Sequence, residues 1–450
     1  MRVGRSHRVD RMDFPTSLKY LFSLGHEVLA AKFGLENINL LLEKLGHPER
    51  AFKSVLVAGT NGKGSVAAML DSIARTAGYR SALFTSPHLQ RIQERIQVSG
   101  REISGESFAE WASTVREAVE SLITAGKLAA PPTFFEQVAA IALCYFRSSA
   151  VELAVLEVGL GGRLDATNAV NRIISVVTSI DFDHQKILGN TIEEIAAEKA
   201  AIIVNDARAV IGRQTHQAAT EILMNRCLET GVLPVFVNEP TATEATGVGS
   251  VMFNYESAHS DYVRIVSGLR GRHQADNAAA AIEAAELLNE SGFPITREAI
   301  IKGLRGASWP GRLELISDRP AILLDGAHNP AGARALRKFL DEFCHSPITL
   351  IFAAMSDKDI ERMAIELFDV ARTIVLTRVR DARSADSARL GGAALRASRN
   401  VIFAETVRQA LSWARSVTPQ DGLICVAGSL YLVGEVKRLI EEADSQTAVI

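Results

Sequence analysis

A short apolar run that leads into a glycine-rich loop constrains the fold of this chain more than any other stretch. Residues 54–58 (SVLVA) are typical of a buried parallel strand, the loop 59–65 (GTNGKGS) follows, and a helical pattern occupies residues 66–77. A strand, a glycine loop and a helix in this order can form a phosphate cradle. The loop N–H groups, the helix N-terminus and Lys63 all supply positive charge to an anion. The sequence therefore predicts phosphate binding here.

The loop departs from the nucleotide-binding consensus G-x-x-x-x-G-K-[ST] in two places. Val57 stands where the consensus has glycine, and Gly64 stands where it has a hydroxyl residue, which comes one place later as Ser65. An ordinary glycine turn is the alternative interpretation of such a loop. Its position between a buried strand and a helix favours phosphate binding, but the pattern alone does not identify the phosphate compound.

Length and composition narrow the class of protein. A chain of 450 residues with 47% hydrophobic content is too long for one core, so we expect two domains. The 49 Lys and Arg against 52 Asp and Glu give a net charge of −3, which argues against nucleic acid or an anionic membrane as partner. We find no apolar stretch long enough for a membrane span and no secretory signal pattern. Four isolated cysteines, Cys144, Cys227, Cys344 and Cys425, indicate a reduced, cytoplasmic α/β protein.

The first part of the chain alternates strand and helix patterns. Ligands gather at the carboxyl ends of parallel strands, which draws attention to the loops 85–89, 159–165 and 181–184 that leave three of the expected strands. We expect strands at 80–84, 152–158 and 172–179, helices at 14–47, 106–125, 133–146, 191–201 and 272–288, a hairpin at 95–103, and a surface loop at 239–250.

A second unit follows a break at Pro310-Gly311, which we take as the hinge. Strand-like runs recur at about the spacing of βα repeats, at 321–324, 348–352, 373–376, 401–403 and 423–426. The sequence thus predicts two α/β domains. The first, residues 1–308, is a P-loop-type parallel-sheet ATPase domain with an N-terminal helical segment, and the second, residues 312–450, is a smaller Rossmann-like domain.

Eleven motifs occur in the order of one known family. The chain resembles folylpolyglutamate synthase and dihydrofolate synthase, the folate branch of the Mur-type ATP-dependent amide ligases. The Mur branch shares the nucleotide loop, whereas TSPHL followed by ERI and the run EVGLGGRLDATN favour the folate branch. The motifs are GTNGKGS (59–65), TSPHL (85–89), ERIQVSG (94–100), EVGLGGRLDATN (157–168), DFDH (181–184), LGNTIEEIAAEKA (188–200), GRHQADNAAAA (271–281), WPGR (309–312), LLDGAHNP (323–330), SDKD (356–359) and AGSLYLVGEV (427–436).

The resemblance implies a reaction and its partners. ATP phosphorylates the carboxylate of dihydropteroate or of a tetrahydrofolate (poly)glutamate, and the amine of L-glutamate attacks the acyl phosphate to give an amide, ADP and phosphate. The expected cofactors are ATP and Mg²⁺, at two sites. The expected partners are these small molecules, without nucleic acid or membrane, and a monomer is the simplest assembly.

The resemblance also assigns catalytic and metal roles to particular residues. Lys63, Glu157, His184 and Lys199 correspond to catalytic positions, and Ser86, Glu157 and His184 to metal ligands. Without the resemblance, Glu157 would be a solvated carboxylate, His184 a loop histidine and Lys199 a surface amine. The family lysine is commonly carbamylated, which requires a neutral amine and hence a desolvated position for Lys199.

Two further groups of residues correspond to binding positions. The nucleotide group contains the phosphate loop and three residues near the hinge, so that both domains would grip ATP. The substrate group lies around the folate and the incoming glutamate, although Phe134 and Phe135 could equally be core. The first group is Thr60, Asn61, Gly62, Lys63, Gly64, Ser65, Asn277, Arg312 and Asp325, and the second is His88, Phe135, His328 and Ser429.

Two other functions stay open. One is a Mur-type ligase that joins an amino acid to a cell-wall precursor, and the other is a P-loop NTPase that acts as a regulatory switch. A switch would not need the stretches DGAHNP and GSLYLVGEV of the second domain. The chain departs from the family at Ala201, where glycine is usual, and this change should be mild inside a helix.

Overall fold

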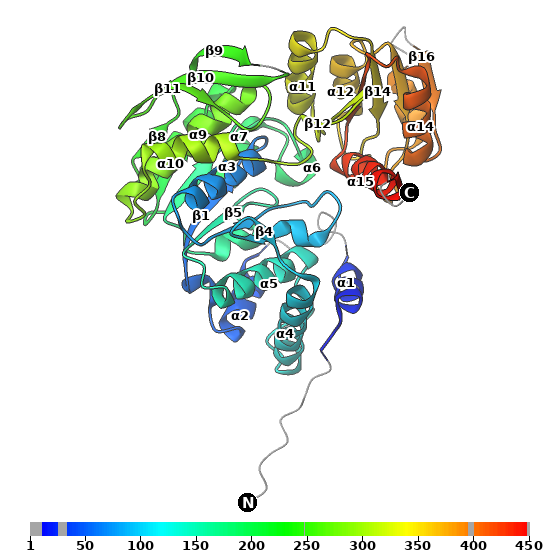
Figure 1. Ribbon diagram of the computed structural model, residues 1–450. Helices are drawn as coiled ribbons and strands as arrows, with labels where there is room; N and C mark the ends of the chain where they lie inside the picture. The colour runs from blue at the N-terminus through cyan, green and yellow to red at the C-terminus, as the bar shows by residue number, and fades with distance from the viewer. Residues whose placement is uncertain (1–10, 26–33, 247, 395–399, 448–450) are drawn as a thin grey trace, which may run out of the picture.

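Two parallel sheets organise the chain, one in its first part and one near its C-terminus (Figure 1). The computed structural model describes residues 11–25, 34–246, 248–394 and 400–447. Within these residues an eight-stranded sheet, a three-stranded sheet and a six-stranded sheet form in chain order. The mixed α/β architecture with parallel sheets confirms the predicted fold class.

The eight-stranded sheet has the order β4-β3-β2-β5-β1-β6-β7-β8. Its central strand, β1 (Lys53–Ala58), lies between β5 (Leu153–Glu157) and β6 (Ile174–Val177), and all three run parallel. This arrangement brings the carboxyl ends of β1, β5 and β6, and the loops that follow them, to one edge of the sheet. The remaining strands are β2 (Ser81–Phe84), β7 (Arg208–Ile211), β8 (Pro234–Phe236) and the antiparallel hairpin of β3 (Ile96–Val98) and β4 (Arg101–Glu102).

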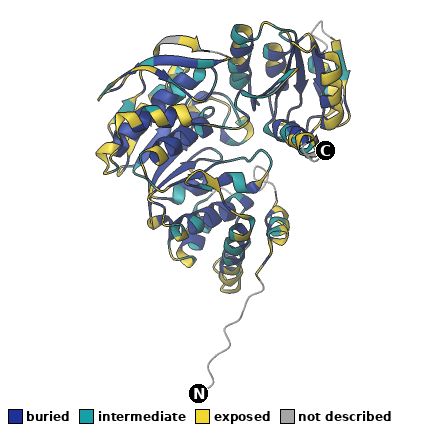
Figure 2. Ribbon diagram, in the orientation of Figure 1, coloured by how far each residue is buried: buried dark blue, intermediate teal, exposed yellow. Residues whose placement is uncertain are grey.

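Helices cover both faces of this sheet, and the alternation of side chains along β1 decides which core each residue joins. Val55 and Val57 belong to one apolar cluster, with helices α3 (Lys63–Thr76), α9 (His273–Glu290) and α10 (Arg297–Gly306). Leu56 points to the other cluster, with α4 (Gly105–Thr124) and α5 (Phe134–Ser148). Figure 2 shows buried strands between helices whose outer faces are exposed.

The N-terminal helices are shorter than predicted. The predicted helix 14–47 is in fact α1 (Phe14–Ser23) and α2 (Glu36–Lys44), and residues 26–33 lie outside the described residues. Asp13 caps α1 by accepting a hydrogen bond of 2.8 Å from the Thr16 N–H. Two more helices, α6 (Gln185–Leu188) and α7 (Ile192–Ala200), follow β6, and α8 (Gln217–Thr230) joins β7 to β8.

A three-stranded antiparallel sheet corrects one prediction. Residues 239–250 were expected to be a surface loop, but β9 (Thr241–Thr246) pairs there with β10 (Ser250–Glu256), which also pairs with β11 (Asp261–Val266). The reason is that this run has no large apolar residue to mark it as a strand, and it becomes one because β10 supplies its hydrogen-bond partners.

The six-stranded sheet has the order β12-β13-β17-β14-β15-β16. Its five parallel strands agree with the predicted ones, and the edge strand β12 (Glu314–Asp318), antiparallel to β13, was not predicted. The parallel strands are β13 (Ala321–Leu324), β14 (Ile348–Phe352), β15 (Thr373–Leu376), β16 (Asn400–Phe403) and β17 (Leu423–Ala427).

Helices again form two layers on this sheet. One layer contains α11 (Pro330–Phe343), α12 (Ile360–Leu367) and α13 (Ser387–Ala394), and the other contains α14 (Val407–Val417) and α15 (Leu430–Thr447). Among the described residues, no helix combines the length and the apolar character that a membrane crossing needs.

Candidate active site

A cavity of about 290 Å³ lies where loops of the eight-stranded and six-stranded sheets meet. The loops that follow β1, β5 and β6 line one side, and the loop that follows β13 lines the other. Every residue predicted to hold the nucleotide is part of this lining, namely Thr60, Asn61, Gly62, Lys63, Gly64, Ser65, Asn277, Arg312 and Asp325. The predicted residues Ser86, Glu157, His184, Lys199 and His328 line the same cavity.

The phosphate loop turns tightly at Gly62, which precedes α3 with φ of +88°. A Cβ at Gly62 would lie 2.3 Å from the Asn277 Oδ1, so the loop needs glycine for both its backbone angle and its space. Lys63 Nζ donates to the carbonyl oxygens of Gly59 and Thr60, each at 3.1 Å. The amine therefore lies over the loop, beside the N-terminus of α3, where an anion would be stabilised.

Glu157 ends β5 as a buried carboxylate. Its Oε2 accepts a hydrogen bond of 3.1 Å from the Ser86 N–H. Burial raises the pKa of Glu157, and the nearby Lys63 ammonium acts in the opposite direction. A buried carboxylate of this kind is stabilised in its charged form by a cation in the cavity.

Lys199 lies near the end of α7, whose start is fixed by a capping box of Thr191 and Glu194. Its side chain is buried, and Nζ donates to the Gly59 carbonyl oxygen at 2.8 Å. Burial, followed by the charge of Lys63, lowers the pKa of Lys199 to about 7. This position is the desolvated one that a neutral amine requires.

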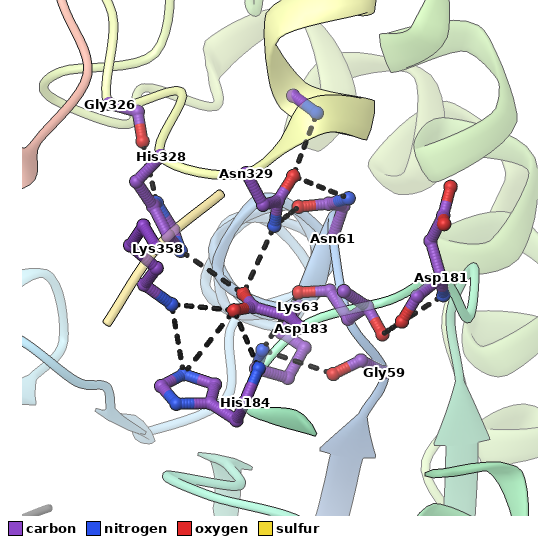
Figure 3. Close-up of polar contacts among 12 residues, drawn as sticks. Gly59, Asn61, Lys63, Asp181, Asp183, His184, Gly326, His328, Asn329 and Lys358 are labelled. Carbon is purple, nitrogen blue, oxygen red and sulfur yellow. Dashed lines mark hydrogen bonds and ion pairs between the residues drawn. The ribbon is translucent and has the colours of Figure 1, made fainter. Parts of the chain in front are cut away.

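Asp183 lies at the centre of contacts that join the two parts of the chain (Figure 3). Lys358 Nζ lies 2.5 Å from its Oδ1, and Asn329 Nδ2 donates to its Oδ2 at 3.1 Å. Burial acts to raise the pKa of Asp183, but the hydrogen bond from His328 and the Lys358 ammonium hold it well below its usual range. The motifs DFDH and SDKD contain Asp183 and Lys358, but sequence reasoning gave neither residue a role.

His184 is next to this centre, with Nε2 at 3.4 Å from the Lys358 Nζ. Burial lowers the pKa of His184 to about 4, although the Asp183 carboxylate acts to raise it. The imidazole is therefore neutral near pH 7, which is the form that binds a metal ion.

Asp325 belongs to the loop after β13 and fixes the backbone near the hinge. Its carboxylate accepts hydrogen bonds of 2.9 Å from the N–H groups of Leu313 and Ala327. Burial raises the pKa of Asp325, while the Arg312 guanidinium opposes the rise. These bonds hold Arg312 and Asp325 on the same wall of the cavity.

A second cavity of about 210 Å³ adjoins the first. The two share Ser86, His184, His328 and the glycine-rich segment 159–161. The first part of the chain contributes apolar side chains and carboxylates to the second cavity, and the second part contributes mostly polar side chains. The lining includes Phe135, Leu164, Ile187, Glu136 and Asp165 from the first part, and Lys358, Arg383, Ser429 and Tyr431 from the second.

Three of the four predicted substrate residues, Phe135, His328 and Ser429, line this second cavity. His88 lines neither cavity, and its Nδ1 accepts a hydrogen bond of 2.7 Å from the Arg95 Nε. Arg383 was not predicted. Its guanidinium carbon lies 5.5 Å from the centre of the Tyr431 ring, and Nη2 lies 3.1 Å from the tyrosine hydroxyl. These contacts hold a cation at the cavity wall.

The side chains in the first cavity suit a metal site that is completed by phosphate oxygens and water, and not one formed by protein side chains alone. Within the part of the chain that the structure describes, no three His, Cys, Asp or Glu side chains are grouped closely enough to hold a metal ion by themselves. Ser86, Glu157 and His184 nevertheless line one cavity beside the phosphate loop. This set fits Mg²⁺, which takes few protein carboxylates and completes its coordination with phosphate oxygens and water.

Comparison with known proteins places the chain among ligases. The family model "Mur ligase middle domain" matches residues 57–285, and "Mur ligase, glutamate ligase domain" matches residues 311–430. The Bacillus subtilis dihydrofolate synthase/folylpolyglutamate synthase is 34% identical over 428 residues, which cover 93% of this chain and 97% of the relative. A probable bifunctional folylpolyglutamate synthase/dihydropteroate synthase of Haloferax volcanii is 35% identical, and this chain spans about half (50%) of its length.

Solved structures of proteins with similar names also resemble this chain. The Escherichia coli FolC in complex with DHPP and ADP superimposes with a TM-score of 0.85 at 28% identity and covers 96% of this chain and 99% of its own. The Mycobacterium tuberculosis folylpolyglutamate synthase complexed with ADP gives a TM-score of 0.87 at 30% identity, with 94% and 98% covered. The agreement extends over both parallel sheets.

Proposed function

Since the chain belongs to the Mur ligase family and to its folylpolyglutamate synthase/dihydrofolate synthase branch, we propose that it is an ATP-dependent ligase. It joins L-glutamate to the carboxyl group of dihydropteroate, of a tetrahydrofolate (poly)glutamate, or of both. Relatives with these activities in their names match most of the chain, and the structures of two of them contain ADP.

One observation carries this proposal: the two cavities meet at Ser86, His184 and His328. A nucleotide in the first cavity would have its phosphates on residues 59–65, close to this junction. In the second cavity, Phe135 and other apolar side chains suit a flat aromatic acid, and the cations Lys358 and Arg383 suit the carboxylates of an amino acid. The three reactants would converge at one place.

The chain's own residues support transfer of a phosphoryl group to a carboxylate. Lys63 and the N–H groups of the loop neutralise the charge on the phosphate oxygens as it develops. The neutral amine of glutamate then attacks the acyl carbon, the C–N bond forms, and the C–O bond breaks. Phosphate leaves with the electrons of that bond and takes up the proton that the amine loses. Contacts such as Asn329 to Asp183 close the two parts over the junction and exclude water, which would otherwise hydrolyse the acyl phosphate.

Ser86, Glu157 and His184 would hold Mg²⁺, which supplies charge neutralisation for the phosphate oxygens. We also propose that Lys199 is carbamylated. A buried amine with a pKa of about 7 is largely neutral in slightly basic solution and can react with CO₂, and the product is an anion beside the metal ligands.

Glutamate needs cations for its two carboxylates. Lys358 and Arg383 line the second cavity together with Ser429. Each cation is already paired with a carboxylate, Lys358 with Asp183 and Arg383 with Asp381, and an incoming carboxylate would share these cations. We propose that Arg383, Lys358, His328 and Ser429 receive the incoming amino acid. Among the described residues, both parts of the same chain line each cavity, which supports a monomeric enzyme, and the free cysteines support a cytoplasmic one.

The test is glutamate-dependent phosphate release from ATP, measured with dihydropteroate, tetrahydrofolate and a UDP-muramyl acceptor in parallel. Release with either pteridine supports the proposal, and release with both identifies a bifunctional enzyme. Release with the muramyl acceptor alone would instead support a cell-wall ligase. A rate that does not depend on glutamate or on any acceptor would support a regulatory NTPase.

A further inference from the structure

Leu89 belongs to a loop of the first part of the chain but packs, partly buried, against the core of the second. The loop 85–89 leaves β2 of the eight-stranded sheet, yet the Leu89 side chain packs against the apolar cluster of the six-stranded sheet that contains Leu432, Val433 and Val436. The structure therefore anchors a loop of one sheet in the core of the other.

Two glycines make room for this anchor. A Cβ on Gly434, in the second turn of α15, would lie 2.0 Å from the carbonyl oxygen of Leu89. A Cβ on Gly311, which has φ of +71°, would lie 3.2 Å from both Cδ atoms of Leu89. The helix thus packs directly on the backbone of Leu89, and the hinge packs on its side chain. Such close contact transmits a displacement of α15 to the loop.

The anchored end of the loop is rigid. The Glu94 carboxylate accepts hydrogen bonds from the N–H groups of Leu89, Gln90 and Arg91, at 2.7, 3.0 and 2.7 Å. At the other end, the Ser86 N–H donates to Glu157 Oε2 at 3.1 Å. Few residues separate the contact with α15 from the contact with Glu157, so the two ends cannot move independently.

We propose that Leu89 is a positioning residue, through which docking of α15 sets the place of Ser86 against Glu157. The inference rests on the proposed function, because Ser86 and Glu157 matter to the reaction only if phosphoryl transfer occurs at this junction. The second part of the chain then does more than cover the nucleotide. It aligns a loop that carries one of the groups at the junction of the two cavities.

Three variants at the contact and one control test the coupling. Leu89→Ala removes the anchor without a clash, and Leu89→Met restores a side chain of similar volume. Gly434→Ala forces α15 and the Leu89 carbonyl apart. Gly392→Ala, at an exposed glycine of α13 where an added Cβ meets nothing within 4 Å, is the matched control for a glycine-to-alanine change in a helix.

The first readout is amide hydrogen exchange in metal-free, nucleotide-free enzyme. We expect faster exchange at the Ser86 amide in Leu89→Ala and Gly434→Ala, and wild-type exchange in Leu89→Met and Gly392→Ala. The second is steady-state kinetics of the folded protein. We expect kcat to fall at least about tenfold in Leu89→Ala, because small misplacements at a reaction centre are costly. ADP binding in EDTA should stay near the wild-type value, since Leu89 is not among the residues that line the first cavity.

The outcomes distinguish an effect of Leu89 on the position of Ser86 from a general loss of folded protein. If Leu89→Ala leaves the Ser86 amide protected as in wild type, or if its loss of activity equals its loss of folded protein, the coupling is refuted. Recovery of both exchange and kcat in Leu89→Met supports it. If the wild-type enzyme shows no glutamate-dependent turnover, the proposed function fails, and the exchange data still decide whether α15 holds the loop.

Discussion

Lys63 and Lys199 donate to one and the same acceptor, the carbonyl oxygen of Gly59, at 3.1 and 2.8 Å. The two amines come from the phosphate loop and from α7, so they meet only in the folded chain. Two ammonium groups at one oxygen repel each other, and burial has already destabilised their charged forms. The pKa of Lys199 falls to about 7 for these two reasons, burial first.

The lowered pKa of Lys199 predicts that its carbamate forms in a pH-dependent way. Lysine is neutral above its pKa, so with a pKa of about 7 the fraction able to react with CO₂ rises as the pH increases through 7. We expect ¹³C NMR with ¹³C-bicarbonate to show a carbamate signal that is strong at pH 8 and weak at pH 6. The signal should be absent in Lys199→Ala, and activity of that variant should be partly restored by added short carboxylates. Lys186→Ala, at an exposed lysine of α6, is the control. Full activity of Lys199→Ala without additives would contradict the carbamate.

Glu157→Gln should abolish ligation and preserve the fold, because it removes a buried charge but little volume. We expect kcat to fall by about a hundredfold or more, since one charge-stabilising group at a reaction centre is commonly worth this much. ADP binding in EDTA should change little. Glu193→Gln, on the exposed surface of α7, serves as the control. Normal turnover of Glu157→Gln at ordinary Mg²⁺ concentrations would remove Glu157 from the proposed metal site.

Arg383→Ala should raise the KM for glutamate at least about tenfold and leave the KM for ATP almost unchanged, because Arg383 lines the second cavity and not the first. Arg383→Lys should recover only part of the loss, since a lysine cannot form two parallel hydrogen bonds with a carboxylate. Arg380→Ala, at an exposed arginine of the same loop, is the control. Equal changes in the KM for glutamate and the KM for ATP would show that Arg383 does not act specifically on glutamate.

Lys358→Met should lower the free energy of unfolding by about 3–5 kcal/mol, because it leaves the Asp183 carboxylate buried without its cation. Urea denaturation measures this loss. The double variant Asp183→Asn/Lys358→Met should recover part of it, because no charge is then left unpaired. Lys338→Met, on the exposed face of α11, should change little. Additive effects of the two substitutions would show that the pair is not coupled.

Gly62→Ala should abolish nucleotide binding, whereas Gly78→Ala should not. Both glycines have a positive φ, +88° and +94°, so each alanine is strained by about 1 kcal/mol or more. Only at Gly62 would the added Cβ also meet a side chain, the Asn277 amide, and at Gly78 it meets nothing within 4 Å. Titration with a fluorescent ADP analogue measures the difference. Nucleotide binding by Gly62→Ala at wild-type affinity would contradict the proposed phosphate cradle.

The sequence was most informative where structure is local. The strand before the phosphate loop, the capping box at Thr191 and the five parallel strands of the second sheet follow from short-range patterns, and the structure agrees with them. The strands β7 to β12 were not predicted. Two of them, β9 and β12, are short, polar edge strands, which take their pairing from distant partners and not from an apolar pattern of their own.

The sequence predicted single residues of the candidate site but not the contacts between residues from distant parts of the chain. Motifs brought attention to Lys63, Glu157 and Lys199, which follow strands or lie on a capped helix. The contact of Asp183 with Lys358 joins residues 175 positions apart, and no periodicity or spacing reports such a pair. Arg383 lies in a loop without a motif, and only its place beside Tyr431 in the folded chain identifies it.

The contact between Asn61 and Asn329 spans 268 positions, and this separation has a consequence for synthesis of the protein. A chain made from its N-terminus completes the phosphate loop early but must wait for residues 325–329 and then for Ser429 before either cavity has its second wall. The site where the two cavities meet therefore forms only after nearly the whole chain has been made, and not when the phosphate loop leaves the ribosome.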